Sequence, residues 1–194
     1  MENKSLDRAL FSNNSGELLN WNMRHAIALG TARGLACLHK ECTNHIIHCG
    51  VKPENILLDK DWVPKVSNFG LAKLIHRDQS YMMTTLKGTQ SYLALEWIKN
   101  APLTEKSDIF SFGIVLLELV VGRRSFDLWS SQQPKQYYLP AWAFDLVEES
   151  ADLSVLAQEQ LRKNLSSENE IDKLSPQQRL PSGASKMRHR VGLQ

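Results

Sequence analysis

The residues whose types and spacing could do chemistry gather in one stretch of eight, from His48 to Asn55, which reads His-Cys-Gly-Val-Lys-Pro-Glu-Asn. A second polar group, Asn68-Phe69-Gly70, begins thirteen residues after Asn55. A histidine can serve as a general base, and amide oxygens are neutral candidate ligands for a hard cation such as magnesium. The chemistry of this chain is therefore expected in these two segments.

Short strands and tight loops are expected to position these residues. Apolar pieces occur at residues 46–47, 56–58 and 65–66, and Asp59-Lys60-Asp61 supplies a turn. Residues 71–95 show little periodicity, and a loop of that length in a compact domain is functional or disordered. The region is thus predicted to be irregular, with brief strands.

Helices are expected on both sides of that region, because apolar residues recur there at helical spacing. They cover residues 1–20 (a short helix and a loop), 21–39, 104–121 and, as one amphipathic helix, 142–163. The helix at 104–121 has Thr104 or Ser107 as a capping residue and Gly122 as a stop. Apolar side chains surround it, so it is predicted to be buried and central. From Ser166 onward the polar composition predicts disorder.

Composition excludes several classes of protein. The 194 residues carry 23 Lys and Arg against 21 Asp and Glu, a net charge of +2 that gives no reason to expect nucleic acid as a partner. The most apolar window, residues 110–121, is interrupted by Ser111 and Glu118 and is too short to span a membrane. The charged N-terminus is not a secretory signal. Three cysteines without a C-x-x-C pair suggest reduced thiols, and we expect a cytoplasmic location.

The order of the motifs resembles the large lobe of a protein kinase. That family shows a catalytic loop H-R-D-x-K-x-x-N, then D-F-G, then A-P-E. This chain has His48 to Asn55, Asn68-Phe69-Gly70, Ala94-Leu95-Glu96, and then Ser107-Asp108 at the start of the apolar helix. The surrounding residues are similar to plant receptor-like serine/threonine kinases, particularly the lectin-type group, over about residues 1–145.

The resemblance implies a mainly α (α+β) fold: a protein-kinase-like large lobe that is incomplete, with the small lobe absent. No two glycines are separated by a single residue, so the G-x-G-x-x-G loop of a small lobe does not occur in these residues. The lysines before the loop, Lys4 and Lys40, are not in a V-A-I-K strand. We expect a partial kinase domain at 1–145, followed by a divergent helix and disordered tail at 146–194.

The resemblance also assigns roles to residues, and two of the positions have changed. Gly50 stands where the family has its catalytic aspartate, and loss of a general base costs about 10²–10⁴ in rate. Asn68 stands at the D-F-G aspartate and lacks the charge that magnesium prefers. Lys52 and Asn55, the latter at a metal-holding position of the family, are retained, either as functional groups or only to hold the geometry of the loop.

Further positions match structural residues of the family. His48 is expected to bond the loop backbone, Asp108 to anchor that backbone from the buried helix, and Glu96 and Arg123 to form a buried ion pair. Thr84 and Thr85 match activation-loop phosphorylation sites, or else are a solvated pair in a loop. These roles rest on the resemblance alone.

Taken together, the resemblance implies a kinase-like fragment, catalytically inactive, that acts by binding proteins such as an intact receptor-like kinase or its substrates. ATP and Mg²⁺ are the cofactors of the family, with weak or absent binding by this chain. The alternatives are a truncated gene product without function, or an active serine/threonine kinase. We also expect Leu6, Leu10 and residues 56–58 to lose part of their cover, and the protein to self-associate.

Overall fold

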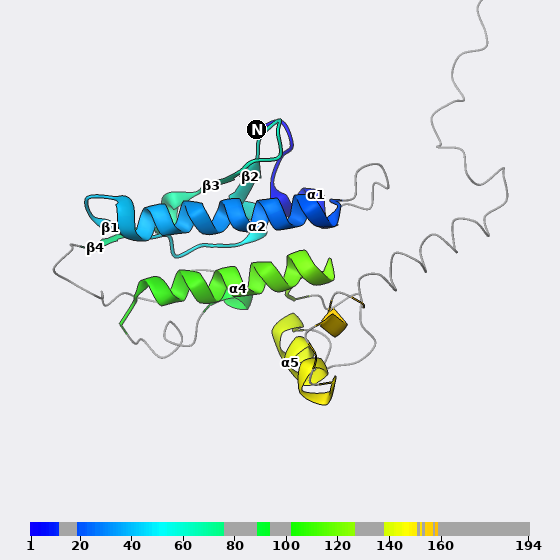
Figure 1. Cartoon of the computed structure of the whole chain (residues 1–194). Coiled ribbons are helices and arrows are strands. Elements are labelled where there is room, and N and C mark those ends of the chain that lie inside the picture. Colours follow the sequence, from blue (N-terminus) through cyan, green and yellow to red (C-terminus); the bar gives the residue numbers. More distant parts are fainter. Residues whose placement is uncertain are drawn as a thin grey trace, which may run out of the picture.

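The computed structural model describes residues 1–11, 19–75, 89–93, 102–126, 138–150, 152, 154–156 and 158. Two long helices, α2 (Trp21–Ala36) and α4 (Glu105–Val121), lie side by side across the molecule (Figure 1). The side chain of Asn20 caps α2, and Thr104 caps α4, which ends at Gly122 in the left-handed conformation. The expected helix at 21–39 differs slightly, because Cys37–Glu41 continue α2 as a π-helical turn.

Buried polar contacts join the two helices in antiparallel order. Near the start of α2, the Arg24 guanidinium donates from Nε to the Leu19 carbonyl and from Nη1 to the Leu119 carbonyl, both at 2.7 Å. Burial lowers the pKa of Arg24, since desolvation disfavours its charge. Beyond the end of α2, His39 reaches Asp108 at the start of α4. The helices are therefore fixed at both ends.

Two small antiparallel sheets carry the irregular region. β1 (His45–Ile47) pairs with β4 (Lys73–Ile75), and β2 (Ile56–Leu58) pairs with β3 (Pro64–Val66). The strands at 46–47, 56–58 and 65–66 match the sequence prediction, whereas β4 lies in a segment expected to be a loop. Three residues show too little periodicity to predict β4, which forms because β1 supplies its hydrogen bonds.

Two glycines on α2 let the second sheet approach the helix closely. A Cβ atom at Gly30 would lie 2.6 Å from Pro64 Cγ, and one at Gly34 would lie 3.3 Å from Val66 Cγ2. Any larger side chain at Gly30 would collide with β3, so these positions bring the strand onto the helix.

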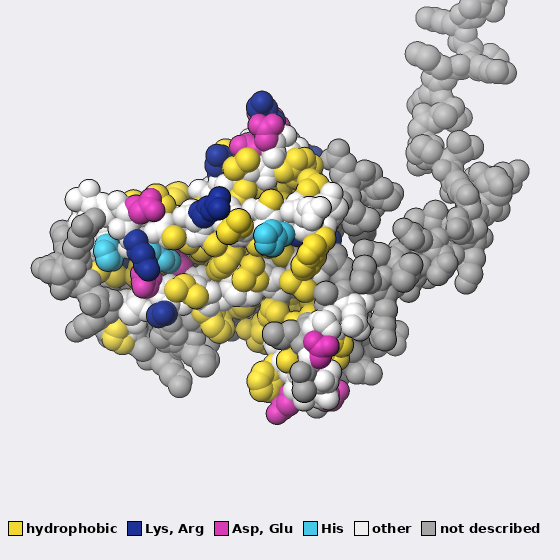
Figure 2. All heavy atoms as spheres, in the orientation of Figure 1, with side chains coloured by type: hydrophobic (Ala, Val, Ile, Leu, Met, Phe, Trp, Pro, Cys, Tyr) yellow, Lys and Arg dark blue, Asp and Glu magenta, His cyan; other side chains and the backbone are white. Residues whose placement is uncertain are grey.

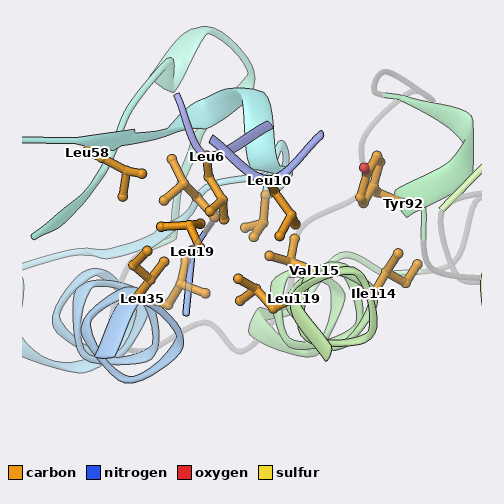
Figure 3. Packing of buried hydrophobic residues seen from close by; sticks show 12 residues of the cluster. Leu6, Leu10, Leu19, Leu35, Leu58, Tyr92, Ile114, Val115 and Leu119 are labelled. Carbon is orange, nitrogen blue, oxygen red and sulfur yellow. The ribbon is translucent and has the colours of Figure 1, made fainter. Parts of the chain in front are cut away.

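The main core lies between the two long helices, the second sheet and α1 (Leu6–Phe11), as Figure 3 shows. Leu6 and Leu10 are 0% and 6% exposed, and Ile56 and Leu58 are also buried. The expectation that these residues lose cover is therefore wrong. The backbone before α1 runs beside β2, where Asn3 N–H donates to the Leu58 carbonyl and Leu58 N–H donates to the Lys4 carbonyl, and this pairing brings α1 over the strand.

Helix α4 is buried on one side only, which corrects the expectation of burial all round. Ile109, Phe110 and Leu116 are 48%, 41% and 37% exposed. Apolar side chains follow the face where α2 and α4 lie together (Figure 2). The buried side includes the polar residues Asp108 and Glu118, so composition alone does not indicate which face is inward.

Helix α5 (Leu139–Ser150) packs against α4, and residues 154–156 and 158 beyond it are again helical. It begins and ends earlier than the helix expected at 142–163. Leu139 and Ala143 are buried in a separate small cluster with Val121 and Leu156. The tail from Ser166 onward lies outside the described residues.

Candidate functional site

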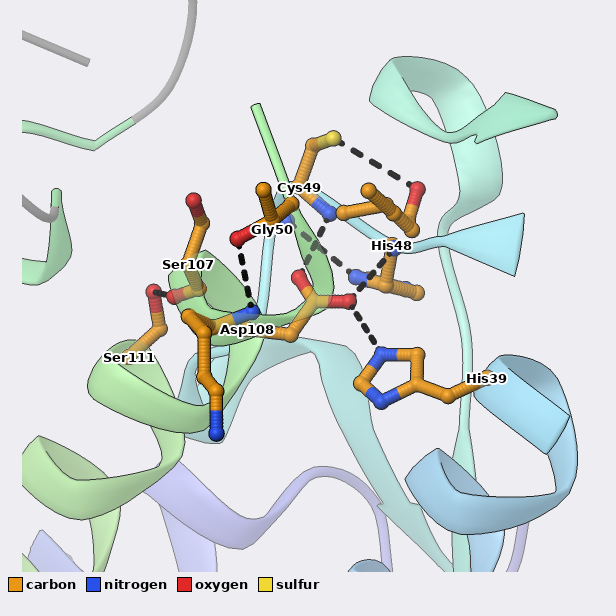
Figure 4. Close-up of polar contacts among 10 residues, drawn as sticks. His39, His48, Cys49, Gly50, Ser107, Asp108 and Ser111 are labelled. Carbon is orange, nitrogen blue, oxygen red and sulfur yellow. Dashed lines mark hydrogen bonds and ion pairs between the residues drawn. The ribbon is translucent and has the colours of Figure 1, made fainter. Parts of the chain in front are cut away.

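The loop from His48 to Asn55, here called the His48–Asn55 loop, is anchored by one buried carboxylate from α4 (Figure 4). Asp108 is 1% exposed. Its Oδ2 accepts from His48 N–H at 2.7 Å and lies 2.8 Å from His39 Nε2, while its Oδ1 accepts from Cys49 N–H at 2.8 Å. The N–H groups of the loop bend around this carboxylate, and Cys49 takes a left-handed φ of 62°.

His48 supports the loop through both of its ring nitrogens, each of which makes a hydrogen bond. It is fully buried. Its Nδ1 accepts from Gly50 N–H at 3.2 Å, so Nε2 carries the proton and donates to the Ser67 carbonyl at 2.9 Å. Both nitrogens are engaged in backbone contacts, and the ring is therefore a structural element of the loop in this arrangement.

Gly50 leaves the centre of the loop without a side chain. A Cβ atom built there would lie 3.5 Å from Asn55 Nδ2 and 3.6 Å from the His48 ring, both ordinary contact distances. Its φ is not in the left-handed range, so a larger residue is not strained. The site therefore has room for an aspartate and contains none, since Asp108 is committed to the loop backbone.

Asn55 ties the end of the loop back to Gly50 and forward to the next segment. Its Nδ2 donates to the Gly50 carbonyl at 2.7 Å, and its Oδ1 accepts from Asn68 Nδ2 at 3.1 Å. Its own carbonyl accepts from both N–H and Oγ of Ser67 at 2.9 Å. The structure thus brings the two polar segments together.

These amides do not fit a magnesium ion. Magnesium binds oxygen and favours carboxylates, but Asn55 Oδ1 already faces the N–H₂ end of Asn68. The Asn55 amide cannot be turned over without losing its bond to Gly50. With the Asn68 amide oriented as in the structure, a cation between the two side chains would meet an N–H dipole instead of a second oxygen.

Lys52 lies at an open hollow beside the loop. Its Nζ donates to Thr89 Oγ1 at 2.9 Å. The described residues that line this shallow hollow are Cys49, Gly50, Val51, Lys52, Thr89, Tyr92, Leu93 and Ser111. Burial raises the pKa of the Cys49 thiol to about 12. Lys52 is accordingly the one charged group in the described lining.

Sequence reasoning missed a second buried carboxylate, Glu118, which is 0% exposed. Its Oε1 accepts from Tyr92 Oη at 2.8 Å and from Ser125 N–H at 2.6 Å, while none of the described residues donates to Oε2. Burial also raises the pKa of Tyr92. The available signal was a single acidic residue inside a strongly apolar helix.

Stability is expected to fall as pH rises, because of Glu118. Burial raises its pKa from 4.5 to about 7, against the partial opposing effect of its hydrogen bonds. The unfolded chain gives up this proton near pH 4.5 and the folded chain only near pH 7, so folding is penalised progressively between them. The full penalty is about 3 kcal/mol above pH 7. Urea unfolding at pH 4.5 and pH 8 measures the difference in the free energy of unfolding between the two conditions. Glu118→Gln should lose the part of this difference that comes from Glu118. A variant with the same difference as the wild type would contradict the assignment.

The remaining predicted positions are only partly visible. Glu96, Thr84 and Thr85 lie outside the described residues, so the expected Glu96–Arg123 pair cannot be followed. The Arg123 guanidinium lies 5.1 Å from the centre of the Trp142 ring on α5. Arg123 therefore contacts α5.

Comparison with known proteins identifies the family. The protein kinase domain model matches residues 1–178. The chain belongs to the protein kinase family. The matched range extends beyond residue 145, the limit of the resemblance expected from the sequence.

Individual relatives confirm the resemblance to plant lectin-type receptor-like kinases. The G-type lectin S-receptor-like serine/threonine-protein kinase At2g19130 of Arabidopsis thaliana is 49% identical over 163 residues, which are 83% of this chain and 19% of the relative. A second, At1g34300 of the same plant, is 47% identical over 157 residues, 80% of this chain and 19% of the relative. LECRK4 of Oryza sativa is 46% identical over 145 residues, 75% of this chain and 18% of the relative. This chain thus spans about a fifth of their length.

The kinase family uses ATP and Mg²⁺ for phosphoryl transfer. In the part of this chain that the structure describes, no helix is both long and apolar enough to cross a bilayer.

Proposed function

We propose that this chain is a kinase-family domain that does not transfer phosphoryl groups and acts by binding another protein. The observation that carries the proposal is Gly50. At that position the family accepts the proton of the substrate hydroxyl, and a glycine has no group to accept it. Among the described residues near the loop, Asp108 is fully engaged by the loop backbone and His48 by Gly50 and Ser67, so neither replaces the missing base.

The Asn55–Asn68 contact supports the same proposal. In the family, an asparagine and an aspartate at these positions hold the metal ions that bridge the phosphates of ATP. Here an amide hydrogen bond of 3.1 Å joins them. Lys52, Asn55 and His48 then serve to keep the loop in shape, which makes Gly50 and Asn68 the sites of lost function.

The fold proposed for this chain is the large lobe of the kinase, with a partial domain at 1–145 and a divergent segment at 146–194. The antiparallel pair of α2 and α4 and the two small sheets support this assignment. A binding partner is proposed to be a protein, such as an intact receptor-like kinase or its substrate, in the cytoplasm. Three cysteines without a C-x-x-C pair are typical of such a reducing compartment.

We expect no phosphoryl transfer by this chain. Purified protein is incubated with labelled ATP, with Mg²⁺ or Mn²⁺, and with a generic basic protein as acceptor. Incorporation should equal that of the Lys52→Ala, Asn55→Ala double variant, because no base is present at Gly50. Label above this control would refute the proposal and favour an active kinase.

A further inference from the structure

Side-chain and backbone bonds join the His48–Asn55 loop to the residues around Asn68. Ser67 donates both N–H and Oγ to the Asn55 carbonyl, and its own carbonyl accepts from His48 Nε2. These contacts involve backbone groups that any sequence could supply. The contact from Asn68 Nδ2 to Asn55 Oδ1 differs, because it depends on the side chain present at residue 68.

The Asn55 side of that contact has a fixed orientation. Asn55 Nδ2 is held at 2.7 Å by the Gly50 carbonyl, so Oδ1 must face residue 68 and requires a donor there. Asparagine supplies an N–H₂ group. An ionised aspartate of the same shape would present only oxygen, and two oxygens about 3 Å apart need a proton or a cation between them.

The backbone at residue 68 also accommodates asparagine. Asn68 has φ 64° and ψ 63°, the left-handed region, which asparagine enters more readily than most residues with a Cβ atom. The amide therefore makes its bond without strain, and glycine at this position would keep the backbone while removing the donor.

We propose that the Asn55–Asn68 bond is a metal-independent latch, which holds the His48–Asn55 loop and the Asn68-Phe69-Gly70 segment together in place of a bridging cation. The inference rests on the proposed non-catalytic function and adds that the conformation of this site does not depend on a metal ion. The Phe69 ring, edge-on to His48 with centroids 5.0 Å apart and 47% exposed, is held at the surface by this arrangement. Phe69 consequently keeps this position whether or not Mg²⁺ or nucleotide is present.

Thermal unfolding in excess EDTA and in millimolar MgCl₂ tests the latch. The wild-type melting temperature should be the same in both. Asn68→Asp should melt about 3–6 °C lower in EDTA, through the lost bond and the facing oxygens, and should recover in MgCl₂. Asn68→Gly should melt lower in both with no response to the metal. Asn22→Asp, which adds the same charge on the exposed side of α2, is the control and should behave as wild type.

Either of two results would overturn the latch. One is a wild-type melting temperature that rises with MgCl₂ as much as that of Asn68→Asp. The other is an Asn68→Asp protein that is as stable as the wild type in EDTA. If Asn68→Asp is unfolded in EDTA, folding on addition of MgCl₂ supports the latch and failure to fold refutes it. Hydrogen exchange of residues 67–71 gives a second readout: it should be equal with and without metal in wild type and faster in Asn68→Gly.

The two proposals fail separately. Phosphoryl transfer by the wild type would refute the proposed function, whatever the melting data show. Metal-dependent stability of the wild type would refute the latch even if no transfer were detected.

Discussion

Replacing Asp108 with alanine is expected to leave no cooperatively folded protein. The carboxylate is 1% exposed and meets His48 N–H, Cys49 N–H and the His39 ring, all within 2.8 Å. Removing it leaves these buried groups without their acceptor, at a cost of about 1–3 kcal/mol for each hydrogen bond to a charged group. The total approaches the whole stability of about 5–15 kcal/mol that a typical domain has.

Urea unfolding followed by circular dichroism measures this loss. Asp145→Ala, on the exposed side of α5, removes the same side chain from the surface and should leave the transition midpoint within error. The transition midpoint of Asp108→Asn should fall between those of the two alanine variants, because the single amide oxygen of asparagine can still accept a hydrogen bond. A midpoint for Asp108→Ala equal to that of Asp145→Ala would show that the loop does not depend on this anchor.

Restoring both aspartates is expected to recover phosphoryl transfer when this chain is joined to the small lobe of a related kinase. Gly50→Asp returns the base, and the first atom of the new side chain, Cβ, would lie at ordinary contact distances of 3.5 and 3.6 Å from its neighbours. Asn68→Asp returns the charged metal ligand. The base alone should contribute about 10²–10⁴ in rate, so the gain over the unaltered fusion should be large.

The matched control is Gly113→Asp, which makes the same exchange on α4, where a new Cβ atom meets no other group within 4 Å. Its fusion should stay inactive. Each single reversion should give less activity than the pair, since the base and the metal ligand serve the same step. A folded double variant with no more transfer than Gly113→Asp would show that the loss of activity is not explained by these two residues.

Local pattern determined much of the secondary structure in advance. Helices at 21–39 and 104–121 were predicted from apolar spacing and capping residues, and they occur as α2 and α4 with their caps at Asn20, Thr104 and Gly122. The strands β1, β2 and β3 were predicted from short apolar runs around a turn. The helix expected at 142–163 occurs in part as α5, which ends at Ser150, and residues 154–156 and 158 are helical again after Asp152, which is not.

The motifs likewise identified which residues make up the site. The order His48 to Asn55, then Asn68-Phe69-Gly70, was enough to place the chain in the kinase family, which the comparisons confirm. It also predicts that Gly50 and Asn68 are the altered positions. Residue type and spacing carry this information because the chemistry requires particular groups in a particular order along the chain.

Tertiary structure alone decided the contacts between distant segments. Strand β4 exists because β1, which lies far earlier in the chain, satisfies its backbone groups, with His45 opposite Ile75 and Ile47 opposite Lys73. The burial of Leu6 depends on backbone pairing with β2, and that of Glu118 on Tyr92 and Ser125. The direction of the Asn55–Asn68 bond depends on the Gly50 carbonyl, which holds the other end of the Asn55 amide. A sequence pattern records which groups are present, but a hydrogen bond depends on the positions of both partners, and only the folded chain sets those.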